Sequence, residues 1–459
     1  MYKIDYNKPG HFHFIGIGGV SMSGLAEILL ERGFTVTGSD ASSSTYTDNL
    51  ILHGAKIVFE QKADNITDDI DCIVYTAAIK EDNPEYIEAV KSGTPMLTRA
   101  QFLGQLMSNY RESIAVAGTH GKTSTTSMIS QILLEMPEDP TISIGGEFAP
   151  IKSNIHVGDS DTFITEACEY TNSYLEFYPK YSLILNIEED HLDFFKDIDD
   201  IRSSFNKFAN NTSEEGTLII NADIPNVSEI TKGTKCNIVT FGSDDKADYY
   251  AKDISFDDFG NAIFTPVYKG EPLDSIHLKV PGVHNVYNAV AAIAFCKVFG
   301  IDMATIKIGL EKFEGADRRF QFKGVKNGIN IVDDYGHHPT EVRMTLEAAK
   351  KYPHNRVVCV FQPHTYTRTK ALLKETAEAL TVADIVILAK IYPAREKDIY
   401  NISSSDLLSE LQKLGVESYY IDTFEGIEEF ILKKCMNKDL LITMGAGDIV
   451  KVGNDLLGQ

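Results

Sequence analysis

The sequence has few cysteines and no long apolar run. Its six cysteines are spread over 459 residues without a CxxC pair, so neither a disulfide framework nor a cysteine-based zinc site is indicated. No apolar run approaches the roughly 18 residues that a membrane-spanning helix needs. The N-terminal residues lack the basic, apolar and small-residue regions of a signal peptide. We therefore expect a cytoplasmic protein without membrane insertion.

Basic side chains are also scarce relative to acidic ones. The chain has 43 Lys and Arg against 66 Asp and Glu, a formal net charge of −23. Because phosphate backbones attract basic surfaces, this balance argues against non-specific nucleic-acid binding, and it argues equally against a polybasic membrane anchor. The hydrophobic content of 43% is ordinary for a soluble globular protein. The length predicts about three domains.

What the chain does have is a regular alternation of short apolar segments with helical patterns. This alternation is typical of βαβ units and predicts an α/β fold with mostly parallel sheets. The segment 247–279 reads instead as short strands separated by turns, which should add antiparallel strands to a central domain. Composition changes near residues 110 and 316 predict three domains. Their expected ranges are 1–110, 111–316 and 317–459.

The segment Gly118-Thr-His-Gly-Lys-Thr123 lies between an apolar strand and a helix expected to begin near Ser124. It is a shortened phosphate loop. In such a loop, successive backbone N–H groups hold phosphates, Lys122 reaches the outer phosphate oxygens, and the Thr123 hydroxyl can bind Mg²⁺. The strand before it and the helix after it favour this interpretation over a plain glycine-rich turn with a surface lysine.

A second glycine-rich turn, Gly16–Gly24, also follows a strand and opens a helix, and Asp40 closes the next strand. Glycines let the backbone approach a diphosphate at a helix N-terminus, and an acidic group can reach a ribose hydroxyl. The spacing departs from a strict GxGxxG, so it indicates a nucleotide without specifying NAD. An NAD-dependent oxidoreductase would explain this turn and leave the phosphate loop unexplained.

Two further side chains are candidate metal ligands. Glu166 and His191 each follow a predicted strand, and the carboxyl ends of parallel strands meet at the edge that carries the phosphate loop. A carboxylate and an imidazole there could hold divalent ions. Downstream, Asn285 and Asn288 open an alanine-rich helix. They could cap that helix or recognise an adenine edge, and spacing alone leaves both alternatives open.

The last third of the chain concentrates His, Arg and Asp in three short segments, 317–320, 333–339 and 362–368. Loops that follow strands are frequent positions for binding residues. Cations placed there could bind carboxylates and stabilise charge in a transition state.

Taken in order, these motifs resemble the Mur ligase family, over nearly the whole chain from Ile15 to the turn at 445–448. Seven segments carry the resemblance: 16–24, 118–123, 166–170, 186–193, 282–288, 333–339 and 362–368. The resemblance implies a Rossmann-like N-terminal domain that binds the UDP part of a sugar nucleotide. It implies a central phosphate-loop ATPase-like domain that binds ATP and Mg²⁺, and a Rossmann-like C-terminal domain that binds an amino acid and closes over the site.

Among Mur ligases the sequence is most similar to those that join L-alanine to UDP-N-acetylmuramate in peptidoglycan synthesis. The implied reaction forms an acyl phosphate from ATP and releases ADP and phosphate. The alternative is a recycling ligase that attaches a murein peptide to the same sugar nucleotide. A catalytically silent nucleotide sensor would not need Lys122, Thr123, Glu166 and His191 together. The implied partners are these small molecules, and the protein could be a monomer or a homodimer.

The resemblance also implies residue roles. The UDP-sugar residues would be Gly16, Gly18, Gly19, Ser23, Gly24, Ser39, Asp40, Thr76, Ala77 and Ala78. ATP would contact Gly118, Thr119, His120, Gly121, Lys122, Thr123, Ser124, Asn285, Asn288, Arg319 and Asp334. The amino acid would contact Tyr335, His337, His364 and Arg368. Metal ions would bind Thr123, Glu166 and His191, and the catalytic residues would be Lys122, Glu166, His191, His337 and Arg368.

In this interpretation His337 and Arg368 form a cationic surround for the oxyanion of the tetrahedral intermediate. The residue that takes the proton of the amine is not identified from the sequence. The chain departs from many relatives at Ser21, where they have Gly, and at Thr365, where they have Arg. Phe205 stands near the place of a carbamylated lysine in sister ligases, so we expect no such modification.

Overall fold

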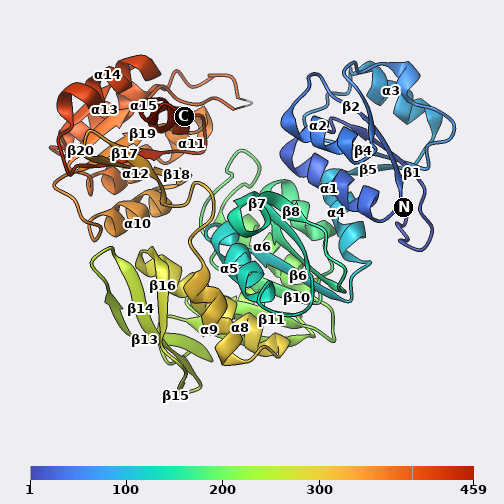
Figure 1. Ribbon diagram of the computed structural model, residues 1–459, viewed down its shortest axis with the longest axis horizontal. Helices are drawn as coiled ribbons and strands as arrows, with labels where there is room; N and C mark the ends of the chain where they lie inside the picture. Colours follow the sequence, from blue (N-terminus) through green and yellow to red (C-terminus); the bar gives the residue numbers. More distant parts are fainter. Residues whose placement is uncertain (1, 395) are drawn as a thin grey trace.

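The computed structural model describes residues 2–394 and 396–459, which form three α/β units in chain order (Figure 1). In the view of Figure 1 the N-terminal unit, in blue, and the C-terminal unit, in orange to red, lie on either side above the central unit. Each unit has its own sheet. The predicted boundaries at 110 and 316 fall between sheets, and their positions stay a prediction.

The N-terminal sheet is fully parallel, with the order β3-β2-β1-β4-β5. The glycine-rich turn lies between β1 and α1, as the sequence predicts. The elements are β1 His11–Ile15, α1 Val20–Glu31, β2 Thr35–Ser39, α2 Thr45–Leu52, β3 Lys56–Val58, β4 Cys72–Tyr75, α3 Pro84–Ser92, β5 Met96–Thr98 and α4 Arg99–Met107, with a 3-10 turn at Ala63–Asn65.

The central sheet has eleven strands, in the order β15-β14-β13-β12-β11-β10-β6-β9-β7-β8 with β16 paired to β14. From β7 to β13 it is parallel, and β13–β16 add the antiparallel strands expected near 247–279. The strands are β6 Glu112–Ala117, β7 Thr141–Phe148, β8 Ser153–His156, β9 Thr162–Ala167, β10 Tyr181–Ile184, β11 Thr217–Asn221, β12 Asn237–Gly242, β13 Tyr249–Phe256, β14 Asn261–Tyr268, β15 Glu271–Pro272 and β16 Ile276–Pro281.

Helix α8 is apolar almost all round and is buried against the central sheet and α5. It begins after Gly282, which has a φ of +95°, and ends at Gly300, whose left-handed conformation is typical of a helix C-terminus. The helices of this unit are α5 Lys122–Leu133, α6 Ile198–Asn210, α7 Val227–Ile230, α8 Val283–Phe299 and α9 Met303–Lys312, with 3-10 segments at Ala149–Ile151 and Tyr170–Glu176.

The C-terminal sheet has the order β17-β18-β22-β19-β20-β21 and is parallel except for β17 at its edge. Its elements are β17 Gln321–Lys326, β18 Ile329–Asp334, α10 Pro339–Ala349, β19 Val357–Phe361, α11 Tyr366–Ala371, α12 Leu373–Leu380, β20 Ile385–Leu388, α13 Ser404–Lys413, β21 Ser418–Tyr420, α14 Phe424–Lys434, β22 Leu440–Met444 and α15 Val450–Leu457.

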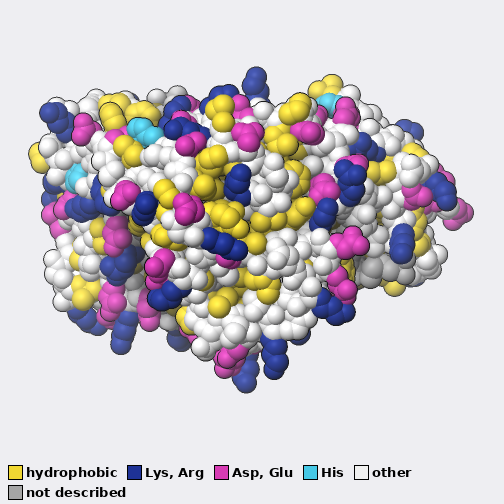
Figure 2. All heavy atoms as spheres, turned by 90° about the horizontal axis from the view of Figure 1, so that it is seen from below, with side chains coloured by type: hydrophobic (Ala, Val, Ile, Leu, Met, Phe, Trp, Pro, Cys, Tyr) yellow, Lys and Arg dark blue, Asp and Glu magenta, His cyan; other side chains and the backbone are white. Residues whose placement is uncertain are grey.

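The surface carries no sign of a bilayer-crossing element. Across residues 2–394 and 396–459, every helix is too short or too polar to cross a membrane. On the face that Figure 2 shows, acidic and basic side chains are interspersed, and a group of hydrophobic side chains lies near the middle.

Candidate active site

The site forms at the carboxyl edge of the central sheet, where β10, β6 and β9 are neighbours. The phosphate loop follows β6, Glu166 lies in β9, and His191 lies in the segment after β10. Parallel strands therefore bring Lys122, Glu166 and His191 to one edge, as the sequence predicts.

The phosphate loop needs its glycines. Gly118 has a φ of +147° and Gly121 a φ of +81°, a region that disfavours other residues. A Cβ at Gly121 would also lie 2.6 Å from Oδ1 of Asn288, so α8 packs directly on the loop. Because Gly121 caps the helix in this conformation, α5 begins at Lys122, two residues earlier than expected.

Lys122 is held by its own loop and by a carboxylate. Its Nζ donates to Oε2 of Glu169 at 2.9 Å and to the carbonyls of Gly118 and Thr119. Burial opposes the charged form, but the Glu169 carboxylate outweighs it and raises the pKa of Lys122 above its usual range. Glu169 was not among the predicted site residues, although it lies in the motif that contains Glu166.

Thr123 and Glu166 provide the oxygen atoms expected of a magnesium site. The Thr123 hydroxyl donates to Oε2 of Glu166 at 3.1 Å, and the N–H of Gly145 donates to Oε1 at 2.6 Å. Hydroxyl and carboxylate oxygens are the ligands that Mg²⁺ prefers. Nε2 of His191 lies 3.9 Å from Oε1 of Glu169 and 3.8 Å from Oδ2 of Asp190. The Thr123 and Glu166 oxygens therefore fit a divalent cation, while His191 lies beside the carboxylates of Glu169 and Asp190.

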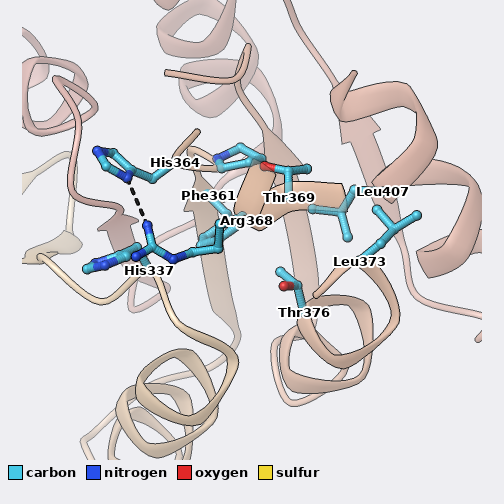
Figure 3. Close-up of a pocket in the computed structure, with 9 residues that line it drawn as sticks. His337, Phe361, His364, Arg368, Thr369, Leu373, Thr376 and Leu407 are labelled. Carbon is cyan, nitrogen blue, oxygen red and sulfur yellow. Dashed lines mark hydrogen bonds between the residues drawn. The ribbon is translucent and has the colours of Figure 1, made fainter. Parts of the chain in front are cut away.

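An ion pair joins the central and C-terminal units. Nη2 and Nε of Arg368 donate to Oδ1 of Asp190 at 2.6 and 3.1 Å, and Nη1 contacts Nδ1 of His364 at 3.1 Å (Figure 3). Burial opposes ionisation of Asp190, but Arg368 dominates and holds the pKa of that carboxyl well below its usual range. Arg368, expected to grip alanine, is thus paired with a carboxylate of the central unit.

The expectation of a cationic His337 is wrong for this structure. Burial, together with Arg368, lowers the pKa of His337 to about 4, although Glu341 acts in the opposite direction. Burial and the neighbouring His337 and Arg368 lower the pKa of His364 to about 3. Both imidazoles are neutral at pH 7, so the positive charge in this group belongs to Arg368. Nδ1 of His337 lies 3.1 Å from the carbonyl of Tyr335.

A second polar group lies where the phosphate loop meets α10. His120 stands between two carboxylates, with Nε2 3.4 Å from Oε2 of Glu188 and Nδ1 3.4 Å from Oε1 of Glu341. Burial opposes protonation, but the two carboxylates raise the pKa of His120 to about 9. The sequence predicted His120 only as part of the loop and missed both carboxylates. The run Glu188–His191 was a signal that more acidic groups face the site.

Asn285 and Asn288 do not cap α8, because its N-cap is Gly282. Both are buried; Asn285 donates to the carbonyl of Pro281 at 2.8 Å, and Asn288 donates to Oδ1 of Asn285 at 3.2 Å. Asp334 accepts from the N–H groups of Gly336 and Phe320, and burial raises its pKa to about 6.

Arg319, also predicted to contact the nucleotide, packs against Tyr335 and Glu341. Its guanidinium lies 5.3 Å from the ring centroid of Tyr335, and Nη1 lies 3.6 Å from Oε1 of Glu341. The structure thus brings the predicted nucleotide residues of two units together, while their contact with adenine stays a prediction.

The first glycine-rich turn is built around Asp40. Its two oxygens accept from the N–H groups of Gly18 and Ala41 at 2.8 and 2.7 Å. Ser39, expected among the UDP-sugar residues, is fully buried, and its hydroxyl donates to Glu85 at 2.5 Å. Its side chain is therefore turned into the fold and not toward a ligand.

Ser23 and Gly24 also have roles within the fold. The Ser23 hydroxyl donates to the carbonyl of Val20. A Cβ at Gly24 would lie 3.0 Å from Ile155, so Gly24 packs against the central unit. Gly16, with a φ of +82°, and Gly19 stand in the turn itself.

A cavity of about 940 Å³ opens between the three units. The predicted residues that line it include Thr76 and Ala77 from the N-terminal unit, His191 from the central unit, and His364 and Arg368 from the C-terminal unit. Ala78 follows directly, and its N–H lies 3.5 Å from the Thr76 hydroxyl. Arg99, which also lines the cavity and donates to Ser21 at 3.2 Å, was not predicted.

A smaller cavity of about 10 Å³ lies beside the large one, within the C-terminal unit (Figure 3). His337, His364 and Arg368 line it together with apolar side chains such as Phe361 and Leu407. Its size is that of a single water molecule. The large cavity is therefore the space that can admit an amino acid beside Arg368.

Comparisons with known proteins agree with this three-domain α/β architecture and its phosphate loop. Residues 11–111 match the description "Mur ligase family, catalytic domain", residues 116–296 "Mur ligase middle domain", and residues 318–447 "Mur ligase, glutamate ligase domain". These matches cover most of the chain, and the protein belongs to the Mur ligase family.

Individual relatives are similar over their whole length. Proteins named UDP-N-acetylmuramate–L-alanine ligase from Agathobacter rectalis and Lachnospira eligens are 58% and 57% identical, with 100% of each chain covered. The solved structure of UDP-N-acetylmuramate-alanine ligase MurC from Thermotoga maritima is 30% identical, with a TM-score of 0.81 and 98% of each chain covered. A murein peptide ligase from Psychrobacter arcticus is 25% identical, with a TM-score of 0.72 and the same coverage.

Proposed function

We propose that the protein joins L-alanine to UDP-N-acetylmuramate, with conversion of ATP to ADP and phosphate, in peptidoglycan synthesis. The observation that carries the proposal is the set Lys122, Glu166 and His191 at one edge of the central sheet, where His191 also lines a cavity formed by all three units. The full-length relatives that bear this activity in their names, at 57–58% identity, support it. A cytoplasmic location follows from the substrates.

In the proposed reaction the lactyl carboxylate of the sugar nucleotide attacks the γ-phosphorus of ATP. Carboxylate and phosphate repel each other, so positive charge must be supplied. Lys122 supplies part of it once the phosphates displace Glu169 from its ammonium. Mg²⁺ held by Thr123, Glu166 and His191 would neutralise further phosphate charge.

The amine of L-alanine then attacks the carbonyl carbon of the acyl phosphate, and the tetrahedral oxyanion that forms collapses to the amide with release of phosphate and loss of the amine proton. Arg368 is a charged group beside the cavity that can bind the alanine carboxylate or stabilise the oxyanion. Because acyl phosphates hydrolyse readily, the contacts between the central and C-terminal units serve to exclude water.

We infer that His337 accepts the proton of the amine. Its Nδ1–H donates to the carbonyl of Tyr335 at 3.1 Å, which leaves the lone pair on Nε2. With a pKa of about 4 it is neutral at pH 7 and free to take a proton. Because a pKa of about 4 lies below the near-neutral value that best suits a general base, proton transfer to His337 requires substrate binding to raise this pKa.

Mass spectrometry of the products tests the proposed function. L-Alanine and a tripeptide that begins with L-alanine are offered together, with ATP and UDP-N-acetylmuramate. We expect the alanine adduct to dominate. A dominant tripeptide adduct would replace the proposal with a recycling ligase, and ATP hydrolysis without any adduct would reject both.

The magnesium proposal has a separate test. Glu166→Gln removes a charge from the oxygen set but keeps its size. We expect the Mg²⁺ concentration for half-maximal phosphate release to rise sharply and turnover to fall. An unchanged Mg²⁺ titration would remove Glu166 from the metal site.

A further inference from the structure

Two imidazoles and a carboxylate meet at the junction of the central and C-terminal units. His120 comes from the phosphate loop, Glu188 from the segment after β10, and His338 from the N-cap of α10. One ligand atom from each lies within 4.8 Å of the others. The group shares no residue with the oxygen set of Thr123 and Glu166.

The spacing suits a tetrahedral ion. Bonds of about 2.0–2.1 Å to such an ion place its ligand atoms about 3.4 Å apart. Nε2 of His120 lies 3.4 Å from Oε2 of Glu188, and Nδ1 of His338 lies 4.0 Å from the same oxygen. The first pair is already at the required separation, and the second needs a small side-chain shift.

In each histidine, the ring nitrogen that points away from Glu188 has a partner that fixes the orientation of the ring. Nδ1 of His120 faces the Glu341 carboxylate at 3.4 Å, and Nε2 of His338 lies 3.1 Å from the carbonyl of Glu189. Metal-binding histidines almost always donate their other N–H to a carboxylate or a backbone carbonyl, which fixes the tautomer. Nδ1 of His338 therefore presents a lone pair, whereas Nε2 of His120 is protonated beside Glu188 and must lose that proton when an ion binds.

The inner nitrogen of His120, Nε2, lies in an ion pair with Glu188 but makes no hydrogen bond among the described residues. His120 is 7% exposed and His338 6% exposed. Two contacts of Thr340 compete with an ion. Its N–H donates to Nδ1 of His338 at 3.3 Å, and its hydroxyl donates to Oε2 of Glu188 at 2.6 Å.

We propose that His120, Glu188 and His338 bind a transition-metal ion of the Zn²⁺ type, separately from the Mg²⁺ of catalysis. Imidazole nitrogen suits zinc, whereas Mg²⁺ prefers oxygen, so the two sites select different ions. Because two ligands come from the central unit and one from the C-terminal unit, the ion ties the phosphate loop to α10. Its binding holds the two units in the closed arrangement.

Equilibrium dialysis of the full-length protein against Zn²⁺, with Mg²⁺ in excess, tests the site. We expect one bound equivalent, and Co²⁺ in its place should give the intense visible absorption of tetrahedral coordination. Glu188→Gln and His338→Gln should each weaken Zn²⁺ binding at least tenfold. His53→Gln, an exposed histidine in the N-terminal unit, is the matched control and should bind as the wild type does.

His191→Gln distinguishes the two metal sites, and it should keep the Zn²⁺ equivalent. Loss of Zn²⁺ binding in that variant, equal binding in all variants, or no stoichiometric binding would each overturn the proposal. Circular dichroism confirms that each variant is folded. The assay uses no substrate, so its failure is distinct from a failure of the proposed ligase function.

Discussion

Lys122 carries the charge on which the proposed phosphoryl transfer depends, and here its ammonium is paired with Glu169. We expect Lys122→Ala to abolish ligation and to leave sugar-nucleotide binding nearly intact, because the UDP site is expected in the N-terminal unit. Calorimetric titration with UDP-N-acetylmuramate measures this binding. Lys207→Ala, on the exposed side of α6, is the control. Loss of sugar-nucleotide binding in a folded Lys122→Ala protein would contradict the domain assignment.

Arg368 can act on the substrate or on the closure of the units. A bidentate guanidinium grips a carboxylate in a way that lysine cannot match. We expect Arg368→Lys to raise the KM for L-alanine far more than the KM for ATP, because losing a charge-assisted bond costs roughly 1.5–3 kcal/mol, about ten- to a hundredfold.

Asp190→Asn is the comparison, since it breaks the same ion pair from the central side. Steady-state kinetics of both variants decide the question. If both variants raise the KM values for L-alanine, ATP and UDP-N-acetylmuramate equally, Arg368 acts through closure of the units and not in the alanine pocket.

Residues brought together within one sheet could be predicted, and residues brought together across units could not. Glu166 lies in β9 and His191 follows β10, the two parallel strands on either side of β6, so their approach to Lys122 follows from the alternation of strands and helices. Glu341 and Asp190 depend on how the units pack, which no local pattern encodes. Ser39 was expected among the UDP-sugar residues, but its hydroxyl donates to buried Glu85, which is 46 residues away in the chain.

Among the secondary-structure elements, the loop before α5 should tolerate no side chain at Gly121. Alanine there would have to adopt a φ near +81° and place Cβ 2.6 Å from Asn288. We expect Gly121→Ala to raise the KM for ATP at least tenfold, since left-handed backbone alone costs roughly 1–2 kcal/mol.

Gly146→Ala is the matched control, because a Cβ there meets no atom within 4 Å and its φ is not positive. Initial-rate kinetics at varied ATP concentration compare the two variants. Equal KM values for ATP in both would contradict the assigned role of the loop.

The element pattern was the most predictable part of the fold. Apolar strands alternating with helices predicted α/β units, and the turn-rich segment 247–279 predicted the antiparallel addition seen in β13–β16. Boundaries were less predictable. The sequence predicts a strand over 182–186 before His191, but β10 covers Tyr181–Ile184, and the Asn186 side chain binds the backbone of His120.

For the molecule as a unit, the family and the three-domain architecture are confirmed by the comparisons over nearly the whole chain. The residue roles stay predictions, because they depend on ligands that meet between units. The segment 186–191 shows why. It contacts the phosphate loop through Asn186 and the C-terminal unit through Glu188 and Asp190. The predicted nucleotide site and the contact between the central and C-terminal units therefore share one short segment.

The contact between α8 and α10, at the junction of the central and C-terminal units, makes the stability of the molecule sensitive to acid. His284 opens α8, and its Nδ1 is buried without a hydrogen bond among the described residues. Burial and the nearby Arg319 lower its pKa to about 4, against about 6.5 in an unfolded chain. The unfolded state therefore binds more protons between these values. The contribution of neutral His284 to stability is complete above pH 6.5 and is lost as the pH falls toward 4.

His284→Gln should remove this dependence, because glutamine does not titrate. Urea unfolding followed by circular dichroism at pH 7 and pH 5 gives the loss of stability for each protein. The value at pH 7 accounts for any packing cost of the substitution. We expect the wild type to lose up to about 2 kcal/mol more than the variant, since a tenfold difference in proton affinity between the folded and unfolded states corresponds to about 1.4 kcal/mol. Equal losses of stability in the wild type and in His284→Gln would mean that the fold does not hold His284 neutral. The acid sensitivity of the protein would then originate at other residues.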